Sequence, residues 1–183
     1  MTPIEPPTAM DDRTPVPAAW FSCVGRPFAA AEHAAIAAMI GGHAELARAE
    51  IGGVRHWHEA GAFIRAAEWD NTWWEHEEEE RARLWECAAD RHAEDDLLAR
   101  LTAVTQALGA AVHGAAAAAA ARDGGADPAL VRAAAGAALL AAQQHALAGL
   151  AGEGAAHFFA CKYALFAGGR WPLGCHRGRY VVF

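Results

Sequence analysis

Serine is almost absent from this chain, because Ser22 is the only one in 183 residues. No Gly-x-Ser-x-Gly motif surrounds it, so a hydrolase-type serine nucleophile is not predicted. The pairs Gly124-Gly125 and Gly168-Gly169 also lack the Gly-x-x-x-x-Gly-Lys pattern that cradles phosphate groups. The sequence therefore predicts no catalytic residue and favours a protein that is not an enzyme.

Positive charge is also scarce. Lys162 is the only lysine, and the formal net charge of the chain is -7. A protein that binds duplex nucleic acid usually gathers Lys and Arg on one face, whereas the arginines here are scattered, with one local group at Arg170, Arg177 and Arg179. We therefore expect no nucleic-acid partner.

Close cysteine pairs and targeting segments are missing. The cysteines at positions 23, 87, 161 and 175 are widely spaced, which argues against a disulfide scaffold and a zinc ribbon. The N-terminal residues show no basic region followed by an apolar one, so no signal peptide is predicted. No run of about 18 residues has the hydrophobicity of a membrane span. We expect a cytoplasmic protein without membrane contacts.

What the chain does contain is a helical pattern. Hydrophobic residues make up 54% of it, many of them alanine, with seven Trp and seven Phe as the bulky candidates for a core. Asp127-Pro128 is a typical helix start, with Asp as N-cap and Pro at the first position. The strongest three-four spacing of apolar residues joins Leu97, Leu101, Val104, Leu108 and Val112. Together these signals predict helices at about 27–52, 62–89, 93–122, 128–150 and 155–167.

The predicted fold is mostly all-α. Residues 1–17 are rich in Pro and Thr and predict a disordered or loosely docked arm, whereas 18–183 form a single helical domain. We expect an antiparallel bundle of about five helices with a short C-terminal β-hairpin or extended flap at 169–183. A lone hairpin is marginal in water, so the flap must lie against the helices. Residues 90–96 hold no strong helix breaker, so the helices at 62–89 and 93–122 are either one rod or two.

The C-terminal stretch combines aromatic residues with arginines. In a structural interpretation, Trp171 plugs the bundle. In a functional one, Trp171 and Tyr180 are anchors of a binding edge and the arginines contact acidic groups. An exposed strand edge there would also permit dimerisation by strand pairing. The candidate binding residues are Trp171, Tyr180, Arg170, Arg179, Trp73 and Trp74.

The densest charged segment runs from Glu75 to Arg83. On a helix, Glu77 would face Arg81 and Glu79 would face Arg83 at i,i+4. Such runs usually mark a solvated face, although tryptophans flank this one. The alternative is a site for a divalent metal, either zinc, iron or manganese, with ligands drawn from several segments. The candidate ligands are His76, Glu79, Glu80, His92 and His56.

A second candidate zinc set lies nearer the C-terminus. It comprises His157, Cys161, Cys175 and His176, but adjacent ligands at 175 and 176 rarely serve one ion, so a plain core role for Cys161 is favoured. No cofactor is predicted. The favoured function is a non-enzymatic interaction or binding protein that uses the aromatic flap, with a protein partner or a second copy. The alternative is a metal-dependent enzyme. We expect the site between the tail, the fifth helix and the acidic run.

Overall fold

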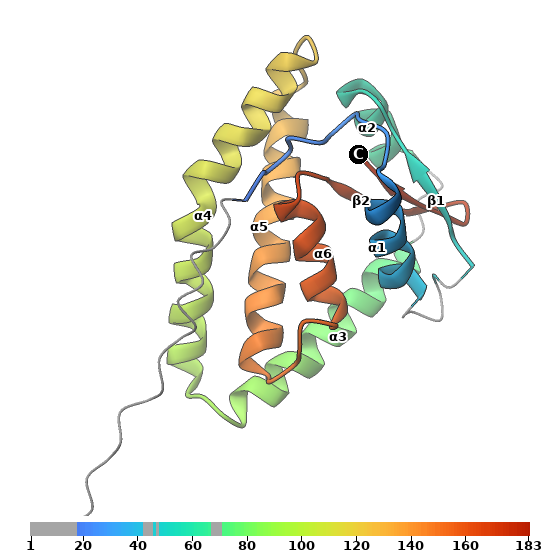
Figure 1. The fold of residues 1–183 in the computed structure, drawn as a ribbon. Helices are drawn as coiled ribbons and strands as arrows, with labels where there is room; N and C mark the ends of the chain where they lie inside the picture. The colour runs from blue at the N-terminus through green and yellow to red at the C-terminus, as the bar shows by residue number, and fades with distance from the viewer. Residues whose placement is uncertain (1–17, 42–45, 47, 67–70) are drawn as a thin grey trace, which may run out of the picture.

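We describe the fold from a computed structural model in which the described residues are 18–41, 46, 48–66 and 71–183. Within these ranges the chain is mostly helical and carries a small three-stranded sheet (Figure 1). The predicted mostly helical class is therefore confirmed. The arm predicted for 1–17 lies outside the described residues.

Nine elements follow one another along the described chain, and the strands occur near its two ends. In chain order they are α1 (Ala30–Gly41), β1 (Glu50–Gly53), α2 (Trp57–Ile64), α3 (Asn71–Ala89), α4 (Glu94–Arg122), α5 (Pro128–Leu150), α6 (Phe158–Ala167), β2 (Pro172–His176) and β3 (Arg179–Val182).

Helices α4 and α5 form a long antiparallel hairpin (Figure 1). Their facing surfaces are rich in buried alanine, including Ala116 and Ala119 on α4 and Ala134 and Ala138 on α5, and alanine lets two helix backbones approach closely. Helix α5 starts as predicted, because the Asp127 carboxylate accepts a 2.9 Å hydrogen bond from the backbone N–H of Ala129.

Helices α3 and α4 are two helices and not one rod. Helix α3 ends at Ala89, α4 begins at Glu94, and Figure 1 shows a sharp corner between them. Helices α3 and α6 both pack on α5. Helix α6 begins later than predicted, because the Nδ1 atom of His157 caps it by accepting a hydrogen bond from the N–H of Phe159 at 3.1 Å.

The sheet overturns the prediction of one helix over 27–52. Helix α1 ends at Gly41, and residues 50–53 form β1, which pairs in parallel with β3. Strand β2 pairs antiparallel with β3, so the order is β1-β3-β2. The tail is therefore the central strand, with neighbours on both sides. The prediction of one helix over 62–89 was also wrong, because α2 runs from Trp57 to Ile64 and α3 begins only at Asn71.

The aromatic tail lies in the core. Trp171 and Phe183 pack with Trp57, with ring centroids 5.6 Å apart for Trp57 and Trp171 and 5.4 Å apart for Trp57 and Phe183. Tyr180 belongs to a second buried cluster together with Trp73. The flap is thus an internal part of the domain. An isolated two-stranded hairpin is only marginally stable in water, so this segment needs the packing that the core gives it.

One described helix, α4, is long and apolar enough to cross a membrane by length and composition alone. We expected no run with the hydrophobicity of a membrane span, and by length and composition α4 is such a run.

Candidate functional site

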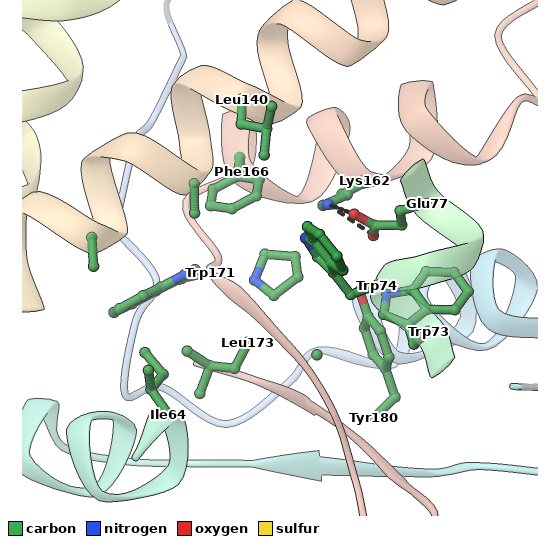
Figure 2. A pocket seen from close by; sticks show the side chains of 14 residues that line it. Ile64, Trp73, Trp74, Glu77, Leu140, Lys162, Phe166, Trp171, Leu173 and Tyr180 are labelled. Atoms are coloured by element: carbon green, nitrogen blue, oxygen red, sulfur yellow. Dashed lines mark hydrogen bonds and ion pairs between the residues drawn. The ribbon is translucent and has the colours of Figure 1, made fainter. Parts of the chain in front are cut away.

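A pocket of about 390 Å³ lies where the C-terminal sheet meets α3, α5 and α6 (Figure 2). This pocket lies between the tail, α6 and the acidic run of α3, where we expected a site. Its lining residues are Ile64, Trp73, Trp74, Glu77, Ala133, Ala137, Leu140, Lys162, Phe166, Trp171, Pro172, Leu173, Gly174 and Tyr180.

Aromatic side chains form the deep part of the pocket. Trp73, Phe166, Trp171 and Tyr180 are all buried, and the Trp73 and Tyr180 rings meet edge to face with centroids 6.3 Å apart. Figure 2 shows Tyr180 rising from the sheet toward the tryptophans of α3. Four of the six predicted binding residues, Trp73, Trp74, Trp171 and Tyr180, therefore line one pocket.

The rim of the pocket exposes large apolar side chains. Trp74 is 57% exposed, Leu140 38% and Ile64 37%. Among the described residues, only one other large apolar side chain is comparably exposed, namely Leu98. Isolated exposed apolar residues are common on protein surfaces, but a contiguous group marks a binding surface. These three come from α3, α5 and α2, and the fold gathers them at one opening.

One wall of the pocket carries a buried ion pair. The Lys162 Nζ atom donates to both carboxylate oxygens of Glu77, at 2.8 and 2.6 Å, and lies 3.4 Å from the Oε1 atom of Gln144 (Figure 2). The side chains of Lys162 and Glu77 are 12% and 7% exposed. The only lysine of the chain thus ties α6 to α3 and α5 beside an apolar cavity.

The burial of Glu77 corrects the interpretation of the acidic run as a solvated face. Glu77 lies four residues after Trp73 and seven before Leu84, and all three are buried, so one face of α3 points inward. The predicted i,i+4 pairs were also wrong. Arg81 pairs with Glu78 and Arg83 with Glu80, both at i,i+3. The spacing from Trp73 was the signal that could have revealed Glu77.

Tyr180 supplies a second polar atom in the pocket. Burial raises its pKa well above the ordinary value, and the negative charge of Glu77 adds to that shift, so the phenol stays protonated at neutral pH. Its side chain is almost fully buried and lines the pocket. A protonated phenol in an apolar wall can both donate to and accept from a ligand.

The two predicted arginines do not line this pocket. Arg170 is buried, and its guanidinium binds both carboxylate oxygens of Glu32 at 2.8 and 2.9 Å and the carbonyls of Cys23, Arg26 and Pro27. It therefore fastens the segment before α1 to the end of α6. Arg179 lies at the start of β3, with its guanidinium packed over Gly52 of β1.

The predicted metal ligands do not converge. The Nδ1 atom of His56 is 2.9 Å from an Asp123 oxygen at the C-terminal end of α4, whereas His92 precedes the N-terminal end of the same helix. Helix α4 has 29 residues, so these ends are about 40 Å apart at 1.5 Å per residue. Glu80 instead contacts the Nε2 atom of His157 at 2.8 Å and pairs with Arg83.

No group of three or more His, Cys, Asp or Glu side chains suited to a metal ion occurs among the described residues. The predicted metal site around His76 and Glu79 is therefore not formed by the described residues, and neither is the second candidate zinc set, which comprises His157, Cys161, Cys175 and His176. In that second set, His157 caps α6 and contacts Glu80, and Cys175 is buried in the core. Of the candidate carboxylate ligands, Glu80 is thus engaged by Arg83 and His157 instead.

No protein-family model, curated protein or solved structure matches this chain. Chemically, the pocket offers an apolar cavity with two polar features, the Glu77–Lys162 pair and the Tyr180 hydroxyl. That combination is typical of a site that binds a ligand, in which apolar walls give affinity and a few polar atoms give orientation.

Proposed function

We propose that this protein is a non-enzymatic binding protein whose pocket beside the C-terminal sheet takes a small, mainly apolar organic molecule. The observation that carries the proposal is the gathering of Ile64, Trp74 and Leu140 around the opening of one aromatic cavity. A ligand that covers exposed apolar side chains binds favourably, because apolar surface is then removed from contact with water.

The size and walls of the pocket support a ligand with a flat or compact apolar body. Its volume of about 390 Å³ falls in the lower part of the range of pockets for small molecules, roughly 300–1,000 Å³. Trp73, Trp74 and Trp171 offer ring faces and edges to such a body. A rigid aromatic wall also loses little conformational entropy when the ligand binds.

The polar atoms of the pocket support a ligand with one hydrogen-bonding group. Tyr180 lines the pocket, and its phenol can both donate and accept a hydrogen bond. The Lys162 ammonium already donates to Glu77, and the pair leaves no net charge on that wall. We therefore infer a neutral ligand with a hydroxyl, carbonyl or amide group.

Binding of a protein partner or of a second copy remains a prediction, but the sheet order bears on the version in which two copies pair through a strand edge. Strand β3 has β1 on one side and β2 on the other, so β3 itself cannot pair with another chain. Strand β2, also part of the flap, is an outer strand of the sheet among the described residues, so pairing through the flap stays a prediction for β2.

The proposal is tested with N-phenyl-1-naphthylamine, a neutral apolar fluorescent probe. We expect saturable binding at one site per chain, with an increase in probe emission as the probe leaves water. Replacing Leu140 by Glu places a charge on the rim at a position that is already 38% exposed, so the fold tolerates it. We expect this variant to bind the probe at least roughly tenfold more weakly, because an ionised group disfavours an apolar ligand beside it.

The matched control is Leu98→Glu, which puts the same charge on an exposed leucine of α4 that does not line this pocket. It should bind the probe as the wild type does. The proposal is wrong if the wild type shows no saturable binding, or if Leu98→Glu weakens binding as much as Leu140→Glu.

A further inference from the structure

A second, polar pocket lies on the other side of the Trp57–Trp171 contact. It has a volume of about 140 Å³. Trp171 lines the apolar pocket and Trp57 lines this one, so the two aromatic rings separate them. The residues that line it are Ser22, Val24, Arg26, Arg55, Trp57, Ala119, Arg122, Asp123 and Phe183.

Three arginines from distant parts of the chain meet at this pocket. Arg26 precedes α1, Arg55 follows β1, and Arg122 ends α4. Two features bring Arg26 close to Arg55. Gly25 has a φ of +76°, and a Cβ atom there would collide with the carbonyl oxygen of Arg55. The buried Arg170 guanidinium holds the Arg26 carbonyl at 2.7 Å.

The three guanidinium groups have no acidic partner among the residues that the structure describes. Within the described ranges, none of Arg26, Arg55 and Arg122 forms a side-chain ion pair or hydrogen bond. The one carboxylate at the pocket is already satisfied. Asp123 accepts hydrogen bonds from the backbone N–H of Trp57 at 2.8 Å and contacts His56 at 2.9 Å. Three positive charges therefore face one occupied negative charge, in a chain whose net charge is -7.

Trp57 forms one wall of this pocket and is almost fully buried, with its indole Nε1 atom closed to water. The groups that a ligand in the pocket can reach are therefore the exposed guanidiniums. A ligand rich in acceptor oxygens would balance their three positive charges.

We propose that this pocket binds a tetrahedral oxyanion, either free phosphate or the phosphate group of a larger molecule, through Arg26, Arg55 and Arg122. Guanidinium groups match phosphate oxygens in geometry and charge. The volume fits, because 140 Å³ corresponds to between four and five water-sized atoms at about 30 Å³ each, and phosphate has five non-hydrogen atoms. This site is independent of the apolar pocket.

The test is calorimetric titration of the whole chain with inorganic phosphate and, in a second arm, with glycerol 3-phosphate. We expect saturable binding at one site per chain that weakens as salt is added. Arg55→Gln combined with Arg122→Gln removes two exposed side chains without touching the core, and should weaken binding by about tenfold or more, since each lost charge-assisted bond is strong. Tighter binding of the ester would identify the group as part of a larger ligand.

The matched control is Arg132→Gln, which makes the same change at an exposed arginine of α5 outside this pocket. It should bind phosphate within about twofold of the wild type, because its side chain does not line the pocket and cannot form the direct charge-assisted bonds. Absence of saturable binding to the wild type would overturn the proposal. Equal weakening by Arg132→Gln would also overturn it, because binding would then reflect overall charge.

Discussion

The buried pair of Lys162 and Glu77 allows the sharpest test of the account of the pocket wall. Changing Lys162 to Met keeps most of the side-chain volume and removes the ammonium. Glu77, which is 7% exposed, then loses the one cation that pairs with it among the described residues, in a site that also contains the buried Tyr180 ring. An uncompensated buried charge is costly because the interior solvates it poorly.

The magnitude follows from the burial of both partners. Exposed ion pairs contribute about 0–1 kcal/mol, whereas removal of one partner from a buried pair costs about 3–5 kcal/mol. The exposed fractions of 12% and 7% place this pair in the second class. We therefore expect Lys162→Met to lower the free energy of unfolding by about 3–5 kcal/mol, measured by urea unfolding followed by circular dichroism.

The matched control removes both charges. Lys162→Met combined with Glu77→Leu leaves no buried charge, so its stability should lie within about 1 kcal/mol of the wild type. The reasoning would be refuted by a cost of less than about 1 kcal/mol for Lys162→Met alone, because that value is typical of a pair exposed to water. It would also be refuted if the double variant were as unstable as the single one.

Two other contacts give predictions of the same kind. Arg170→Met should lower the free energy of unfolding, measured with urea, by about 3–5 kcal/mol, because it leaves Glu32 and three backbone carbonyls without their donor. A decrease of less than about 1 kcal/mol would show that water replaces the guanidinium. Hydrogen bonds from Arg83 and His157 lower the pKa of Glu80 from 4.5 to about 2, so its stabilising effect is complete above pH 4.5 and is lost as the pH falls toward 2. The stability difference between the wild type and Glu80→Gln should therefore shrink over that interval, and a constant difference would contradict it.

Local signals in the sequence were reliable where local chemistry decides the structure. The Asp127-Pro128 start predicted α5, and the spacing from Leu97 to Val112 predicted α4. Helix α5 has an N-cap and α4 has an apolar stripe. Each of these signals favours a helix through contacts within one or two helical turns. Four of the predicted binding residues, Trp73, Trp74, Trp171 and Tyr180, line one pocket, and their role in binding stays a prediction.

Long-range pairing explains what the sequence did not reveal. Glu50–Gly53 is a strand because it pairs with Arg179–Val182, and no local pattern announces a partner so far along the chain. Glu77 looked like one member of a solvated run because its partner, Lys162, lies 85 positions away on α6. The three arginines of the polar pocket are likewise distant in sequence. They come from the segment before α1, the segment after β1 and the end of α4.

The central claim is that an apolar ligand binds between the C-terminal sheet and α3, α5 and α6. Its most direct test is the indole N–H region of a two-dimensional nitrogen–proton NMR spectrum, recorded with and without N-phenyl-1-naphthylamine. We predict shifts in the signals of Trp73, Trp74 and Trp171, which line the pocket, and unchanged signals for Trp20 and Trp85, which do not. Shifts confined to Trp20 or Trp85 would contradict the claim.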